Sequence, residues 1–177
     1  MKLKYLAAAW GLAEATVFFI VPDVLLTYVA LKEGKRATRL CLWTLGAALI
    51  GGALMFGWGT RDKEAAEDLL VKIPAISQDM VEEVEQQVEE GGAKAAFVGP
   101  LTGRPYKIYA VHAGNSDVNL AVFLLVSIPA RLLRFLVLAW VTTFIAKCLL
   151  RKKSARFKTL LLTGIWLSFY AWYFSAM

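Results

Sequence analysis

Five long apolar stretches, separated by short segments rich in charged residues, make up most of this 177-residue chain. The stretches cover residues 5–31, 40–59, 95–113, 118–149 and 159–177. A helix needs roughly 20 consecutive apolar residues to cross a bilayer, and residues 40–59 and 159–177 provide them without an internal charge. The chain is 58% hydrophobic with a mean hydropathy of +0.55, more than a soluble domain of this length could bury. We therefore expect a single all-α integral membrane domain over residues 1–177.

Two of the five stretches are interrupted by prolines. Residues 5–31 contain Pro22, and residues 95–113 contain Pro100 and Pro105. A proline removes a backbone donor and breaks a helix in its interior. The freed backbone groups are tolerated at membrane depth only where protein or water satisfies them. Each stretch is therefore predicted to be a re-entrant hairpin, which enters and leaves the membrane on the same side; two ordinary kinked spans are the alternative.

The distribution of charge supports the hairpins, because loops rich in lysine and arginine stay on the cytoplasmic side of a membrane. Two lysines precede residues 5–31 and four basic residues follow them directly, so both flanks and the N-terminus are expected to be cytoplasmic. Residues 61–94 hold four basic and ten acidic residues, a balance of −6, and are expected outside. Residues 147–158 hold six basic residues and no acidic one, and are expected inside.

These assignments predict an inverted repeat, in which a hairpin followed by a span occurs twice with opposite orientation. The first unit covers residues 5–59 and the second covers residues 95–149. Residues 61–94 are expected to form external acidic amphipathic helices, with Ser77 as an N-cap, and residues 159–177 an extra C-terminal transmembrane helix. Inverted repeats of this kind bring broken helices together near the middle of the membrane, where transporters hold their substrates.

The charged residues near the breaks differ in sign between the two units. The first unit contributes the acidic residues Glu14 and Asp23. The second unit contributes the basic residues Arg104, Lys107, Arg131 and Arg134. Charged side chains inside a membrane usually pair or line a wet cavity. The basic residues could bind a phosphate group, and a desolvated Glu14 or Asp23 could carry a proton. The alternative is that the charges form structural ion pairs, for example between Glu14 and Arg131.

Other classes of function lack support in the sequence. The net charge is +6, but the basic residues lie in short blocks beside apolar stretches, which favours topology-setting loops over nucleic-acid binding. Cys41 and Cys148 are interpreted as free thiols. His112 is the only histidine and has no partner at a catalytic or metal-binding spacing, so a packing role is favoured. We therefore expect no enzyme, no catalytic residue, no metal and no cofactor.

Several motifs resemble the DedA superfamily, also called VTT-domain or SNARE-associated membrane proteins. In the first hairpin, "AEATVFFIVPDVLL" is similar to the family's glutamate followed by a Pro-Gly-acid turn, although the glycine is absent. The glycine-rich "LGAALIGGALMFGWGTR" resembles the following span, and "SIPARLLRF" resembles the start of the later one. "GPLTGRPYKIYAVHAG" resembles the second hairpin, with a lysine in place of an arginine. The chain is thus similar to a small, divergent member.

The resemblance implies a transporter, flippase or scramblase of the bacterial inner membrane. Its substrate would be an anionic lipid, either undecaprenyl phosphate or a phospholipid, and proton coupling is an option. Membrane lipids are then the expected partners, with no nucleic acid, and assembly as a homo-oligomer stays open. Two alternatives are kept: a transporter of a small anionic metabolite, and a membrane assembly protein without transport activity.

Overall fold

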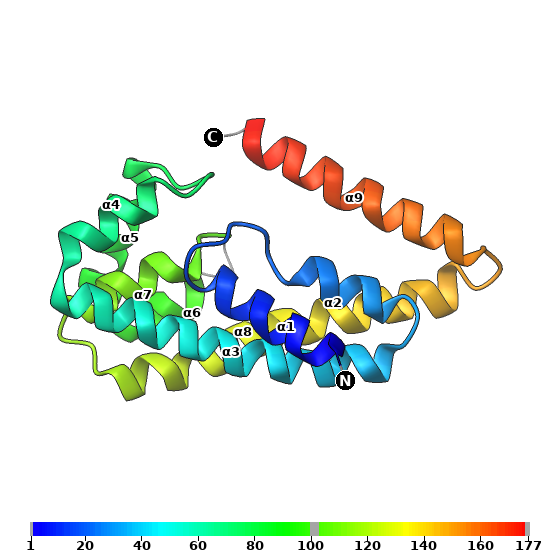
Figure 1. Ribbon diagram of the computed structural model, residues 1–177, viewed down its shortest axis with the longest axis horizontal. Coiled ribbons are helices and arrows are strands. Elements are labelled where there is room, and N and C mark those ends of the chain that lie inside the picture. Colours follow the sequence, from blue (N-terminus) through cyan, green and yellow to red (C-terminus); the bar gives the residue numbers. More distant parts are fainter. Residues whose placement is uncertain (1, 100–102, 176–177) are drawn as a thin grey trace.

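Two long helices lie side by side along the length of the molecule in the computed structural model, which describes residues 2–99 and 103–175 (Figure 1). They are α3 (Gly34–Arg61) and α8 (Leu120–Phe144), and α8 continues as the π-helical turn η3 (Ile145–Leu149). Within the described residues, α3 and the helix over Leu120–Leu149 are the two helices long and apolar enough to cross a membrane. Helix α3 contains the predicted span over residues 40–59, and Leu120–Leu149 covers the predicted span over residues 118–149 except for its first two residues.

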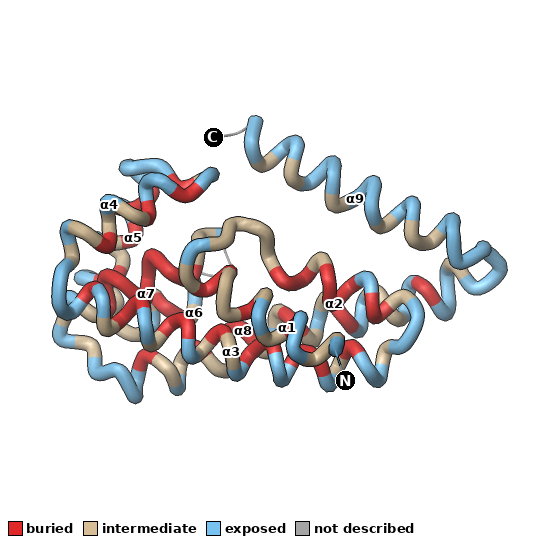
Figure 2. Tube along the Cα trace, viewed as in Figure 1, coloured by how far each residue is buried: buried red, intermediate tan, exposed pale blue. Residues whose placement is uncertain are grey.

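The C-terminal helix α9 (Ala155–Ser175) was expected to be a further span, but it does not meet the same measure of length and hydropathy. Its tryptophans, tyrosines and serines lower its hydropathy relative to α3 and α8. None of its residues is buried, and Figure 2 shows exposed and half-buried positions alternating along it. The C-terminal span therefore stays a prediction.

The first proline-containing stretch forms two helices with a break between them. Helix α1 (Lys2–Glu14) ends at the acidic residue of the first predicted motif, and α2 (Asp23–Ala30) begins directly after Pro22. The chain turns back between them, so that α1 and α2 run in opposite directions (Figure 1). The break is held by the indole of Trp10, whose Nε1 donates a hydrogen bond to the Ile20 carbonyl oxygen at 2.9 Å.

The second proline-containing stretch is also broken. The short helices η1 (Gly92–Lys94) and α6 (Ala95–Val98) precede the break, and α7 (Tyr106–Gly114) follows it. Pro105 is the residue before α7 and has an extended backbone, as is typical of an N-cap residue. The predicted break at Pro100 lies outside the described residues.

The acidic segment forms the two helices that the sequence predicted, α4 (Lys63–Val71) and α5 (Gln78–Gly91). The hydroxyl of Ser77 accepts a hydrogen bond from the Met80 amide at 3.3 Å, so its predicted role as an N-cap is confirmed. The segment does not lie apart from the rest as a surface linker, however. Val81, Val84 and Val88 of α5 and Leu70 of α4 are buried in one core cluster with α3 and α7.

This burial gives the first testable prediction. Leu70→Ala should lower the free energy of unfolding by about 2–5 kcal/mol, because Leu70 is fully buried and its truncation leaves a cavity. Val71→Ala is the matched control, since the neighbouring Val71 is 39% exposed and should change stability by about 0.5 kcal/mol or less. Thermal or denaturant unfolding in detergent measures both. Equal effects of the two substitutions would show that α4 is not part of the core.

Glycines allow α3 to contact α7 backbone to backbone. A Cβ atom added to Gly59 would overlap the Val111 carbonyl oxygen, and one added to Gly114 would overlap the Phe56 carbonyl oxygen. The hydroxyl of Thr60 donates a hydrogen bond to the Gly114 carbonyl oxygen at 2.9 Å across the same contact. The glycine-rich part of α3 therefore serves close helix packing, and Figure 2 shows buried residues concentrated where α3, α7 and α8 meet.

Candidate functional site

Two acidic side chains from the first broken stretch face two arginines of α8. Glu14 is the last residue of α1 and Asp23 is the first residue of α2, so the break between the helices brings both carboxylates to one region. Arg131 and Arg134 are three residues apart and therefore share a face of α8. Nη2 of Arg131 donates to a carboxylate oxygen of Glu14, and Nη2 of Arg134 donates to one of Asp23.

The pair of Glu14 and Arg131 is closed off from solvent. The two side chains are 7% and 3% exposed. The guanidinium of Arg131 lies over the ring of Tyr106, with 4.4 Å between the Arg131 Cζ atom and the ring centroid. Its Nε and Nη1 atoms are buried without a hydrogen-bond partner among the described residues. Because the buried ion pair also packs against an aromatic ring, we interpret it as a contact that stabilises the fold.

The pair of Asp23 and Arg134 is more open. Asp23 is fully buried, whereas the Arg134 side chain is 25% exposed. The second carboxylate oxygen of Asp23, Oδ1, is buried without a hydrogen-bond partner in the described part of the chain. Both residues line a cavity, and Arg131 does not. Arg134 is thus the arginine of α8 that a bound molecule could reach.

Lys107 connects the two broken stretches. It lies in the first turns of α7 and is 2% exposed. Its Nζ atom donates a hydrogen bond to the Phe18 carbonyl oxygen at 2.7 Å, in the break between α1 and α2. The lysine therefore satisfies a backbone carbonyl that no helix satisfies, while its charge stays next to the cavity that it lines.

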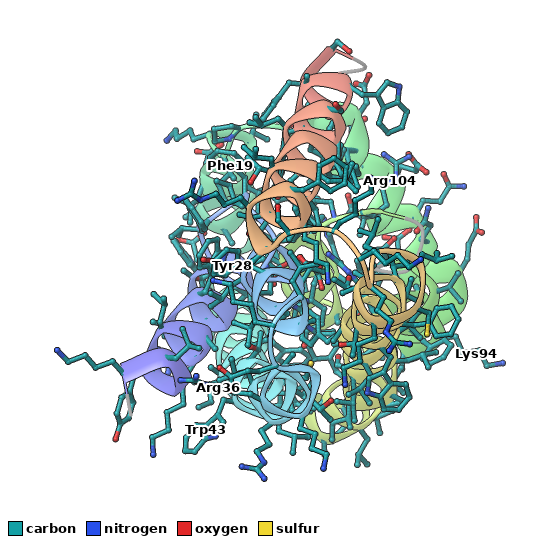
Figure 3. The ribbon with its side chains drawn as sticks, turned by 90° about the vertical axis from the view of Figure 1, so that its right-hand side faces the viewer. Phe19, Tyr28, Arg36, Trp43, Lys94 and Arg104 are labelled. Carbon is teal, nitrogen blue, oxygen red and sulfur yellow. The ribbon has the colours of Figure 1, made fainter. Side chains whose placement is uncertain are left out.

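Arg104 lies apart from these five charged residues. Its guanidinium forms an ion pair with Glu83 of α5, and its side chain is 32% exposed. It nevertheless contributes to the lining of the cavity, as does Phe19. In the end-on view of Figure 3, α9 lies between Phe19 and Arg104. The structure thus brings Glu14, Asp23, Lys107 and the two arginines of α8 together, and places Arg104 at the rim.

The cavity has a volume of about 570 Å³ and is lined mainly by apolar and aromatic side chains. Its walls come from the break between α1 and α2, the turn between α4 and α5, the start of α7, the middle of α8 and one face of α9. The lining residues besides the charged ones include Phe18, Phe19, Val21, Ile73, Pro74, Ile76, Leu133, Val137, Leu138, Trp166, Phe169, Tyr170 and Tyr173. The cavity is therefore mainly apolar, with cationic and anionic groups in its lining.

Aromatic residues of α9 form part of the lining of the cavity. Trp166, Tyr170 and Tyr173 line the cavity. The Tyr170 hydroxyl accepts a hydrogen bond from the Val21 amide, and Nε1 of Trp166 donates one to Thr27, both at 3.0 Å. Their spacing of four and three residues, which places them on one helix face, is the signal that could have indicated this role.

No family model matches the chain, and no solved structure matches it. The chain is 28% identical over 126 residues to an uncharacterised protein of Haemophilus influenzae (strain ATCC 51907 / DSM 11121 / KW20 / Rd). The matched region covers 71% of this chain and 65% of that protein, which is less than two thirds of its length. The chain is thus similar to a protein that carries no description of function, and its own function has to be argued from the site.

Proposed function

We propose that this chain is an integral membrane protein that moves an anionic lipid, a phospholipid or a polyprenyl phosphate, from one side of the bilayer to the other. The observation that carries the proposal is the apolar cavity of about 570 Å³ with Arg134 and Lys107 on its wall. An anionic lipid has a phosphate group for the two cations and hydrocarbon chains for the apolar lining. The resemblance to the DedA superfamily points to the same class of substrate.

The surface of the long helices supports a membrane location. Large apolar side chains project from α3 and α8 and stay well exposed, among them Leu42, Trp43, Ile50, Leu54, Leu125, Leu133 and Phe144. Trp43 points away from the body of the protein in Figure 3. Many large exposed apolar side chains on two helices are costly in water and are typical of contact with lipid or with a partner protein.

The distribution of charge along the molecule supports two ends that face different compartments. The N-terminus, the connection from α2 to α3 and the basic connection from α8 to α9 lie toward one end, and α4 and α5 lie toward the other (Figure 1). The first three carry the basic blocks of the sequence and the last two carry the acidic segment. This arrangement agrees with re-entrant hairpins whose cytoplasmic side is the basic end.

Cysteine labelling tests this topology. Lys2→Cys and Lys35→Cys, each made in a chain with Cys41 and Cys148 replaced by serine, should react with a membrane-impermeant maleimide from the same side of the membrane. Glu89→Cys in α5 should react from the opposite side, because α5 is expected outside. Labelling of residues 2 and 35 from opposite sides would contradict the first hairpin and the inverted repeat with it.

The acidic residues would supply the coupling to protons. Asp23 borders the cavity and has one carboxylate oxygen without a hydrogen-bond partner within the described residues, so a proton has an acceptor there. Protonation of Asp23 would release Arg134 from its ion pair, and a lipid phosphate would then compete for the free guanidinium. Proton binding at Asp23 and phosphate binding at Arg134 are thereby linked in one place.

A second candidate function follows from the ion pairs themselves. Because Glu14 and Asp23 each have an arginine partner, the charges could serve only to fix the packing of a membrane assembly protein. A transporter of small anionic metabolites is less well supported, since such a substrate would not use the apolar lining of the cavity.

Transport in reconstituted vesicles separates these functions. Vesicles that contain the purified chain should move fluorescently labelled phosphatidylglycerol or a labelled polyprenyl phosphate between leaflets faster than protein-free vesicles. Uptake of labelled small anions, such as inorganic phosphate, should stay at the level of the protein-free control. Accelerated uptake of the small anion without lipid movement would favour the metabolite transporter. The absence of both activities would favour the assembly protein.

A further inference from the structure

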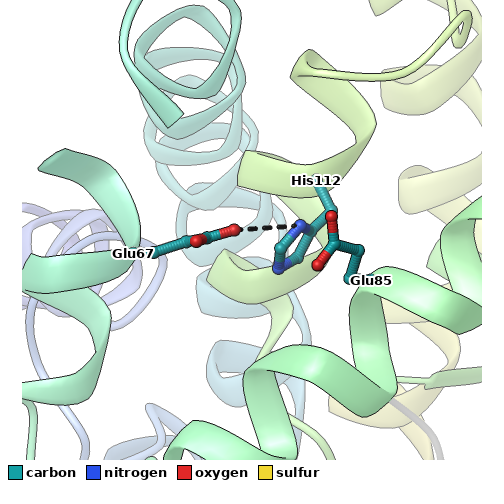
Figure 4. Close-up of side chains that lie close together, drawn as sticks. All are labelled: Glu67, Glu85 and His112. Atoms are coloured by element: carbon teal, nitrogen blue, oxygen red, sulfur yellow. Dashed lines mark ion pairs between the residues drawn. The ribbon is translucent and has the colours of Figure 1, made fainter. Parts of the chain in front are cut away.

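Three side chains from three different helices converge at the acidic end of the molecule, away from the cavity. They are Glu67 of α4, Glu85 of α5 and His112 of α7, and Figure 4 shows the imidazole ring between the two carboxylates. One potential ligand atom of each residue lies within 4.8 Å of those of the other two. Nδ1 of His112 lies 3.6 Å from Oε1 of Glu67.

The hydrogen bonding of this cluster is incomplete. His112 is only 3% exposed, and its Nε2 atom is buried without a hydrogen-bond partner among the described residues. Oε1 of Glu67 is likewise buried without a hydrogen bond. Buried polar atoms in native proteins are nearly always satisfied by protein, ordered water or an ion. The His112 imidazole and the Glu67 carboxylate can each supply an electron pair to a cation, and neither is fully satisfied by hydrogen bonds within the described part of the chain.

A lysine ammonium is the cation that the cluster now holds. Nζ of Lys63 forms an ion pair with Glu85 and lies 3.5 Å from Oε1 of Glu67. The Lys63 side chain is 26% exposed, so it can turn outward to solvent when another cation takes its place.

We propose that Glu67, Glu85 and His112 form a binding site for a zinc ion, for which the ammonium of Lys63 competes. Imidazole and carboxylate ligands suit Zn²⁺, and three protein ligands leave a fourth position for water. With zinc–ligand bonds of about 2.0–2.1 Å, the ligand atoms of a tetrahedral site lie roughly 3.3 Å apart. The two carboxylates are partly exposed and can rotate to close the present separation.

Such a site would join α4, α5 and α7 at the end of the molecule opposite to the basic segments. It rests on side chains that do not line the cavity, so it is independent of the proposed lipid transport. The proposal replaces the packing role that the sequence suggested for His112. The two carboxylates beside His112 come from helices distant in the sequence, so its sequence neighbours did not indicate them.

Zinc titration of the full-length chain in detergent tests the proposal. Isothermal titration calorimetry should show saturable binding of one zinc per chain and a zinc-dependent rise in the melting temperature. Lys63→Met should bind zinc about tenfold more tightly or better, because it removes the competing charge. Glu85→Gln and His112→Gln should each weaken binding by about tenfold or more, because each removes a ligand. Magnesium should give no comparable binding, since it prefers oxygen ligands.

Two control variants make the outcome specific. Glu89→Gln removes an exposed carboxylate from the same helix as Glu85 and should leave zinc binding unchanged, and Lys72→Met should do the same for Lys63. The proposal would be overturned if neither the native chain nor Lys63→Met bound zinc. Binding by Lys63→Met alone would also overturn it, because Lys63 would then hold the site permanently. Undiminished binding in Glu85→Gln would place the zinc elsewhere and have the same result.

Discussion

Arg131→Gln should lower the free energy of unfolding by about 3–5 kcal/mol, because it leaves the buried carboxylate of Glu14 without its counter-ion. The substitution also removes the guanidinium from the ring of Tyr106. The double variant Glu14→Gln with Arg131→Gln should recover most of the loss, since a buried neutral pair can be nearly as stable as a buried ion pair. The melting temperature of the purified protein in detergent measures these effects.

The exposed pair of Glu33 and Arg36 provides the matched control for this prediction. Its side chains are 57% and 47% exposed, so Arg36→Gln should cost about 1 kcal/mol or less. A similar small effect of Arg131→Gln would show that the Glu14 carboxylate finds another partner or stays protonated. In that case the interpretation of the pair as a structural element would be wrong.

Arg134→Gln should reduce lipid movement in reconstituted vesicles by at least about tenfold while the protein still folds. Arg134 lines the cavity, and a hydrogen bond to a charged group is worth about 1.5–3 kcal/mol. A difference of about 1.4 kcal/mol corresponds to a factor of ten. The fluorescence assay with labelled phosphatidylglycerol measures transport, and the melting temperature reports on folding.

A second substitution at Asp23 distinguishes substrate binding from packing. If Arg134 binds the phosphate, Asp23→Asn added to Arg134→Gln should not restore transport, because the cation is still missing. If the pair only fixes the packing, removing both charges should restore it. Arg134→Lys keeps the positive charge and should retain part of the activity, which excludes loss of side-chain volume as the cause. Full recovery in the double variant would remove the case for a phosphate site at Arg134.

Features that depend on a few neighbouring residues could be predicted from the sequence. The amphipathic helices of the acidic segment, the N-cap at Ser77 and the break at Pro22 follow from local chemistry. The signals are periodic apolar residues, a hydroxyl that accepts a hydrogen bond from an amide, and a residue without a backbone donor. The pairing of the acidic residues of the first stretch with the arginines of α8 could also be expected, because an unpaired charge is costly in an apolar environment.

Features that depend on tertiary packing could not be predicted in the same way. The pattern of Val81, Val84 and Val88 indicated one apolar face, but not whether that face would meet lipid, water or α7. The equal chemistry of Arg131 and Arg134 gave no sign that only Arg134 would reach the cavity. His112 was judged by its sequence neighbours, whereas its two carboxylate neighbours come from α4 and α5.

If the chain transports lipid as proposed, the backbone contact at Gly59 and Gly114 restricts the motions that could open its cavity to the two sides of the membrane. It joins α3 of the first predicted repeat to α7 of the second. The two backbones are so close at both glycines that a side chain there would overlap the other helix. A rocking motion of one repeat against the other would have to separate these helices and break their shared core. Helix α9 has no buried residue and closes one wall of the cavity. In the proposed transporter, an outward swing of α9 would open a lateral entrance to the cavity while α3 and α7 stay packed together.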